Sequence, residues 1–219
     1  MRSVMISCVQ RRDERALTLP QLIAADLNPV VIESPCDPAG GPLNRLAAYQ
    51  ALQVLGSNGG LFFEDDIDID RAIFGEAVRL AAETNEICTL FLPRRPSLYP
   101  TGVLTAIAAG VPIPLHAAKL ENTRDRRGYY GSQAVYLPGH FVMGALRLRS
   151  LFMTQDGLPL PEADGFDFYI KDEARAIYGV FPNPVQHRNP PKMKAVTRGN
   201  AAQNPGLNHT SLTYGWRTQ

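Results

Sequence analysis

Cysteine is scarce in this chain of 219 residues. The three cysteines, Cys8, Cys36 and Cys88, are scattered, and two of them fall in apolar stretches where a thiol acts as a small hydrophobic side chain. Their spacing fits neither a disulfide framework nor a zinc site. We therefore expect a fold that is held together by its core rather than by covalent or metal cross-links.

Long hydrophobic runs are also missing. The most apolar window, residues 103–118, contains Gly110, Pro112 and Pro114, so it is too short and too interrupted to span a bilayer. The apolar residues 4–9 run directly into the polar and charged residues 10–13 (QRRD), which does not fit a signal peptide. We expect no membrane span and a cytoplasmic location.

Charge of one sign does not dominate the chain, whose formal net charge is +1. Residues 1–187 carry 17 basic and 21 acidic residues, whereas residues 188–219 carry five basic and no acidic ones. This asymmetry predicts a body that holds cations and a tail that either meets anions or is a solvated arm. The 45% hydrophobic content allows a packed core and excludes wholesale disorder.

Strand-like and helix-like segments alternate in the first half of the chain. We expect strands at 3–9, 29–33, 61–63 and 86–93, and helices at 16–27, at 43–55 and after residue 69. Such alternation predicts an α/β domain with a parallel sheet covered on both faces. Later segments predict a strand or short helix within 103–118, a strand at 132–137, helices at 139–148 and 166–179, and an irregular tail from 188.

Five carboxylates lie within seven residues, directly after the third predicted strand: Glu64, Asp65, Asp66, Asp68 and Asp70. Ligands of α/β sheets bind at the carboxyl ends of the strands. Carboxylates packed this closely repel one another unless a cation neutralises them, and Mg²⁺ and Mn²⁺ prefer oxygen ligands. The cluster therefore predicts a divalent cation that itself holds a diphosphate.

Three other interpretations of the acidic cluster compete with this one. Asp68 or Asp70 could cap the following helix. An EF-hand is excluded because Arg71 and Ala77 stand where its glycine and glutamate are needed. A phosphatase-type aspartyl nucleophile would use Asp66 and Asp68, but that motif usually ends the first strand rather than the third.

The order of these features is similar to that of GT-A type glycosyltransferases. Residues 61–70, LFFEDDIDID, lie about sixty residues after the first predicted strand, where that family has its DxD-like metal motif, and Glu64-Asp65-Asp66 resembles the EDD form of family 25. Residues 7–15 resemble the first nucleotide-binding loop, residues 131–136 (GSQAVY) a G-x-x-A-y strand, and residues 181–187 (FPNPVQH) a late strand of often phage-encoded members. The resemblance covers residues 3–187.

The resemblance implies a single GT-A-like, Rossmann-like domain over residues 1–187, with a mostly parallel central sheet and a basic irregular tail at 188–219. Residues 1–93 would form the nucleotide-sugar-binding half, and residues 94–187 the acceptor half. Mn²⁺ or Mg²⁺ would be bound by Asp66, Glu64, Asp68 and His187. The nucleotide-diphosphate sugar, with a UDP-sugar favoured, would be contacted by Gln10, Arg11, Arg12, Glu33, Asn44, Arg45 and Asp65. One arginine of the pair Arg11-Arg12 is expected to face water.

An inverting transferase needs a carboxylate that deprotonates the acceptor hydroxyl. Asp167 is the preferred candidate base and Asp164 the second, although either could instead cap the predicted helix that follows. A retaining enzyme needs no such base, and the sequence leaves the stereochemistry open.

The acceptor and the role of the tail are also left open. The acceptor hydroxyl could belong to a modified DNA base, a capsid protein or a surface glycan, in the host cytoplasm if the protein is phage-encoded. The tail could cover the donor or contact nucleic acid, and an oligomer could complete the acceptor half. Two alternative functions are a metal-dependent phosphohydrolase or nucleotidyltransferase, and an inactive glycosyltransferase-like binding protein.

Overall fold

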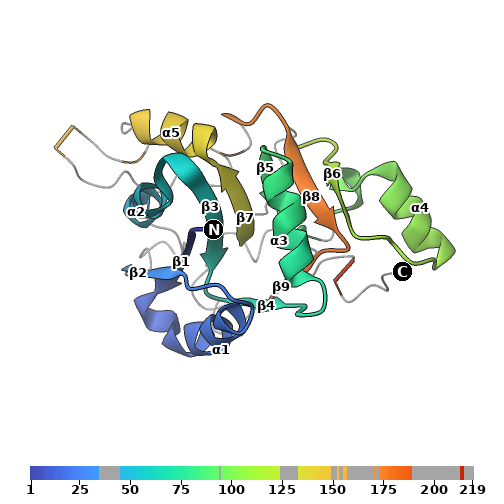
Figure 1. Ribbon diagram of the computed structural model, residues 1–219, viewed down its shortest axis with the longest axis horizontal. Helices are drawn as coiled ribbons and strands as arrows, with labels where there is room; N and C mark the ends of the chain where they lie inside the picture. The colour runs from blue at the N-terminus through green and yellow to red at the C-terminus, as the bar shows by residue number, and fades with distance from the viewer. Residues whose placement is uncertain are drawn as a thin grey trace, which may run out of the picture.

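The computed structural model describes residues 1–34, 45–93, 95–123, 133–148, 152, 155–156, 170, 173–188 and 213–214 (Figure 1). These residues form an α/β domain. Its strands are β1 (Ser3–Cys8), β2 (Val30–Ser34), β3 (Gly59–Glu64), β4 (Ile67–Ile69), β5 (Ile87–Thr89), β6 (His116–Lys119), β7 (Ala134–Pro138), β8 (Ile177–Phe181) and β9 (Val185–His187). Its α-helices are α1 (Arg12–Ile23), α2 (Arg45–Leu55), α3 (Phe74–Glu83), α4 (Thr101–Ala109) and α5 (Gly139–Arg147), and short 3₁₀ turns form η1 (Val9–Arg11), η2 (Gly56–Asn58) and η3 (Pro96–Leu98).

Seven of these strands form one mixed sheet in the order β2-β1-β3-β7-β5-β8-β6. β1 is parallel to both β2 and β3, and β5 is parallel to β8. β7 runs antiparallel between β3 and β5, and β6 is antiparallel to β8. Strands β2, β1, β3, β5 and β8 therefore share one direction, which confirms a mostly parallel α/β sheet.

Side chains of the central strands alternate between two hydrophobic cores, because successive residues of a strand point to opposite faces. Leu61 and Phe63 of β3 pack into one core and Phe62 into the other, and all three are fully buried. Helices α1 and α3 contribute to the first core, and helices α2, α4 and α5 to the second. Both faces of the sheet are thus covered, as the alternating sequence pattern predicts.

A separate two-stranded ribbon joins β4 to β9 in antiparallel register, with Ile67 opposite His187. Figure 1 shows this ribbon between α1 and one end of α3. β4 follows the acidic residues directly, whereas β9 comes from a segment far along the chain. The ribbon therefore brings residue 187 beside the acidic turn.

Several boundaries differ from those expected. The helix expected at 16–27 already starts at Arg12, because Asp13 and Glu14 suit the positive end of a helix, and Pro20 lies inside it. The window 103–118 divides into α4 and the start of β6. The helix expected at 166–179 is wrong for residues 177–179, which belong to β8: Ile177 and Val180 pack into opposite cores, as in a strand.

The cysteines also differ from expectation. Cys8 is disulfide-bonded, so the expected absence of disulfides is wrong. Spacing along the sequence could not reveal this bond, because it depends on which segments meet in space. Cys88 is a free thiol inside the core, where burial raises its pKa. Among the described helices, none combines the length and the apolar character needed to cross a membrane.

Candidate metal centre

The acidic turn begins where the buried strand β3 ends. Glu64 is the last residue of β3, and Asp65 and Asp66 follow it. The side chains of Leu61, Phe62 and Phe63 anchor this strand in both cores, so the carboxylates are held at a fixed place at the sheet edge. Glu64, Asp65 and Asp66 are themselves buried, with exposed fractions of 4%, 0% and 0%.

Glu64, Asp66 and His187 form a three-residue cluster. One carboxylate oxygen from each acid and one imidazole nitrogen all lie within 4.8 Å of one another. The pairing of β9 with β4 places His187 there, and its ring packs on Phe91 with ring centres 6.0 Å apart. Three of the residues expected to bind metal are therefore brought together, although His187 is far from the other two in sequence.

Two cationic or protonatable groups face Asp66. Nη1 of Arg11 and Nε2 of His187 each lie 3.0 Å from Oδ2 of Asp66. Burial opposes ionisation of Asp66, but the interactions with His187 and Arg11 outweigh it and lower the pKa of this carboxyl to about 2. Burial likewise opposes protonation of His187, whereas Asp66 and Glu64 favour it, and the pKa of His187 is raised overall.

The donor set fits a divalent cation. Oδ1 of Asp66 is buried and accepts no hydrogen bond from any described residue. Ligands about 2.1 Å from an octahedral Mg²⁺ are separated by about 3 to 4 Å, close to the spacing in the cluster. The buried turn also has three carboxylates, Glu64, Asp65 and Asp66. Among the described residues, the arginine that pairs with two of these carboxylates, Asp65 and Asp66, is Arg11. Glu64, Asp66 and His187 can therefore hold Mn²⁺ or Mg²⁺, and the imidazole suits Mn²⁺ better.

Asp65 has a different environment from Asp66. Its Oδ2 accepts hydrogen bonds from Oγ of Ser7 and the backbone N–H of Cys8, both at 3.0 Å. Its Oδ1 pairs with Nη2 of Arg11. Asp65 thus ties the end of β1 and η1 to the acidic turn, and it fixes Arg11 beside Asp66.

Asp68 and Asp70 lie outside the cluster of Glu64, Asp66 and His187. Oδ1 of Asp68 accepts a hydrogen bond from Nε2 of Gln21 at 2.9 Å and pairs with Arg188. Oδ1 of Asp70 accepts the backbone N–H of Ala72 at 3.1 Å, in the turn before α3. Asp70 therefore stabilises the turn that leads into α3.

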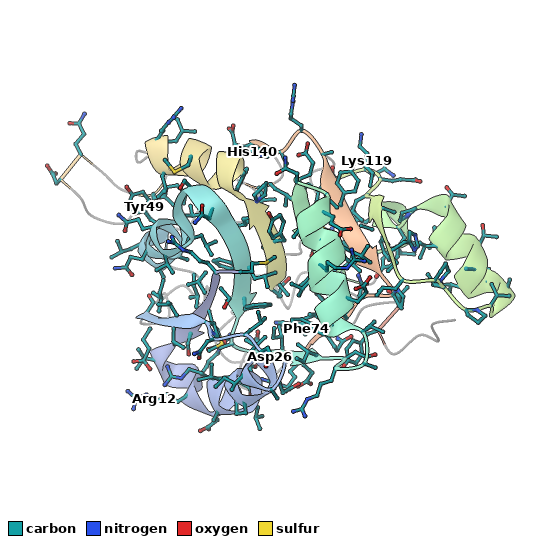
Figure 2. The ribbon with its side chains drawn as sticks, viewed as in Figure 1. Arg12, Asp26, Tyr49, Phe74, Lys119 and His140 are labelled. Atoms are coloured by element: carbon teal, nitrogen blue, oxygen red, sulfur yellow. The ribbon has the colours of Figure 1, made fainter. Side chains whose placement is uncertain are left out.

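The structure describes the side chains of only some of the residues that were expected to contact the nucleotide. Glu33, at the end of β2, pairs with Arg15, whose Nη1 also lies 3.4 Å from Oγ of Ser7. Arg12 is exposed at the outer edge of α1 (Figure 2), so the expectation that one arginine of the pair faces water is confirmed. Only the backbone is described for Gln10, in η1, and Arg45, the first residue of α2, while Asn44, Asp164 and Asp167 lie outside the described residues.

The sequence interpretation missed three polar residues that hold the acidic turn: Thr18 and Gln21 of α1, and Arg188 after β9. Thr18 could have been suspected as a polar residue on the inner face of a helix. No local signal marks Arg188, because its partners are distant in sequence.

Comparison with models of known protein families gives no match for this chain, and a search of curated protein sequences gives none either.

Proposed function

We propose that this protein is a metal-dependent glycosyltransferase, which moves a sugar from a nucleotide-diphosphate sugar to an acceptor hydroxyl. The observation that carries the proposal is the buried cluster of Glu64, Asp66 and His187 at the end of β3. Oδ1 of Asp66 is buried and has no hydrogen-bond donor among the described residues, which favours a cation as its partner.

The surroundings of the cluster support a diphosphate as the second ligand. β1, β2 and β3 are parallel, so their carboxyl ends lie at one edge of the sheet, where α/β proteins bind nucleotides. Arg11 adds a positive charge beside the cluster, and guanidinium groups bind phosphate oxygens well. The mostly parallel sheet with an acidic turn after its third strand is also compatible with the GT-A resemblance.

In this proposal Glu64, Asp66 and His187 hold Mn²⁺ or Mg²⁺, and the metal supplies charge neutralisation for the diphosphate leaving group. Arg11 orients the phosphates from η1, and Asp65 keeps Arg11 in place through the bonds that it already makes. Asp167, or Asp164, remains the proposed base that accepts the proton of the acceptor hydroxyl. Binding, orientation and proton removal are thus assigned to different groups.

Calorimetric titration with Mn²⁺ tests the metal centre directly. The wild-type chain should bind Mn²⁺ saturably, whereas Asp66→Asn, which keeps the size of the side chain, should lose most of this affinity. Asp70→Asn is the matched control, because Asp70 lies on the same turn but faces the approach to α3. Equal affinities of the two variants, or no binding by the wild type, would refute the assignment of the cluster.

A thermal-shift screen with UDP-, GDP-, TDP- and CDP-sugars in the presence of Mn²⁺ tests the donor. A ligand that binds the native state raises the melting temperature by mass action. Transfer of the sugar without release of inorganic phosphate would support a glycosyltransferase. Phosphate release would instead identify a phosphohydrolase, and the absence of any nucleotide-dependent shift would indicate an inactive protein.

A further inference from the structure

Arg188 connects β9 to the acidic turn. It directly follows His187, and its backbone N–H donates to the carbonyl oxygen of Asp66 at 2.8 Å. In the side chain, Nη1 donates to the carbonyl oxygen of Ile67 at 2.6 Å and pairs with Asp68. Arg188 thereby contacts three consecutive residues of the turn: Asp66, Ile67 and Asp68.

The other side of the same guanidinium faces α1. Its Nε lies 3.0 Å from Oε2 of Glu14, and Nη2 donates to the carbonyl oxygen of Glu14 at 2.9 Å and to Oγ1 of Thr18 at 2.6 Å. Thr18 is fully buried, and its hydroxyl donates to the carbonyl oxygen of Asp65 at 2.6 Å. Helix α1, the acidic turn and the end of β9 are therefore joined through one planar group.

We propose that Arg188 is a positioning residue of the metal centre: it fixes the backbone of residues 65–67 and the end of β9, and so sets the distance between Asp66 and His187. This inference rests on the proposed function, because it concerns the same site. Arg188 itself is not a ligand, since all the contacts described for its side chain are to α1 and to residues 65–68. It acts on the metal only through the groups that it holds.

The geometry requires arginine rather than any cation. The guanidinium presents a rigid planar fork of donors, and here Nε, Nη1 and Nη2 are directed at different segments of the chain. A lysine ammonium at the same place could bind Asp68 or Glu14 but could not reach both together with the carbonyl of Ile67. Arg188 is counted in the basic tail of residues 188–219, but its contacts with α1 and the acidic turn make it part of the metal centre.

Mn²⁺ titration of Arg188→Lys and Glu14→Gln tests the inference, with Arg79→Lys as the matched control. Arg79 also pairs with two carboxylates, Glu76 and Glu83, but lies exposed on α3. Residues that support metal ligands typically contribute 10- to 100-fold to metal affinity. We expect about a 10-fold weaker Mn²⁺ affinity for R188K, about 3-fold for E14Q, and no change for R79K. The electron paramagnetic resonance spectrum of bound Mn²⁺ should broaden in R188K, because its ligands are held less uniformly.

The outcomes separate this inference from the proposed function. If R188K binds Mn²⁺ with the affinity of the wild type and gives an unchanged spectrum, the positioning role alone is overturned. If the wild type binds Mn²⁺ but no nucleotide sugar, the transferase function is overturned and the positioning role of Arg188 stands. Absence of Mn²⁺ binding by the wild type would overturn both. If R188K does not fold, E14Q decides, because the Glu14 side chain is 20% exposed and glutamine keeps its size. An affinity of E14Q equal to that of R79K would overturn the inference.

Discussion

Replacing Arg11 with methionine should tighten the binding of Mn²⁺ alone. Arg11 pairs with both Asp65 and Asp66, and its Nη1 lies 3.0 Å from the same oxygen, Oδ2 of Asp66, that faces His187. A divalent cation must therefore compete with the guanidinium for this carboxylate. Methionine keeps much of the length of the side chain and removes its charge.

The size of the effect follows from the bond that the metal has to displace. A hydrogen bond to a charged group contributes about 1.5 to 3 kcal/mol. Removal of the competing guanidinium should accordingly raise Mn²⁺ affinity by about 10- to 160-fold. UDP should respond in the opposite direction, with weaker binding in the presence of Mn²⁺, because its phosphates lose the cation that binds them.

The assay is calorimetric titration of Mn²⁺ with and without UDP, on the wild type, Arg11→Met and Arg12→Met. The neighbouring Arg12 is exposed, so its variant should behave as the wild type. Circular dichroism verifies that each variant is folded before titration. Unchanged or weaker Mn²⁺ binding by R11M in the absence of UDP would refute the idea that Arg11 and the metal compete for Asp66.

Further predictions concern stability in urea unfolding. Gly139→Ala should lower the free energy of unfolding by about 3 kcal/mol, because the new Cβ would lie 1.9 Å from the carbonyl oxygen of Ser57. Gly144→Ala on the same helix meets nothing within 4 Å and should raise it by about 0.5 to 1 kcal/mol. Equal effects would contradict the packing of α5 on η2. Thr18→Val should cost about 3 kcal/mol and Thr18→Ser about 1 kcal/mol, since valine removes the buried hydroxyl that donates to the carbonyl of Asp65 and accepts from Arg188; a neutral T18V would show that the hydroxyl network contributes little. Phe62→Ala should cost about 3 to 5 kcal/mol because this fully buried ring belongs to the core on the α2 and α5 side, and a loss below 1 kcal/mol would speak against that burial.

The buried strands were predictable because their composition leaves little choice. Residues 61–63 are apolar, so the existence of a buried strand there could be read from the sequence. Its bounds could not, because β3 runs from Gly59 to Glu64 and the acidic residues that end it are themselves buried. The sheet order could not. β7 lies between β3 and β5 and runs against both, although it comes after them in the chain, and nothing in residues 134–138 specifies its neighbours.

In the candidate metal centre, too, some features could be predicted from the sequence and others could not. Asp65 and Asp66 are identical side chains in adjacent positions, yet one binds the end of β1 and η1 and the other faces His187. Their separate roles depend on which direction each side chain takes from the turn, which residue type does not specify. Arg188 was counted with a basic tail because charge counting ignores contacts, and its partners only meet it through the pairing of β4 with β9.

The pairing of β4 with β9 has a consequence for biosynthesis. A nascent chain that has emerged from the ribosome up to residue 93 already carries Glu64, Asp65 and Asp66 but lacks the strand that supplies His187 and Arg188. Among the described residues of this stretch, Arg11 is the cation that pairs with Asp65 and Asp66, so we expect the turn to form fully only after Arg188 has been added. Under the proposed function, we expect the cation to bind late in maturation, after β9 has paired with β4.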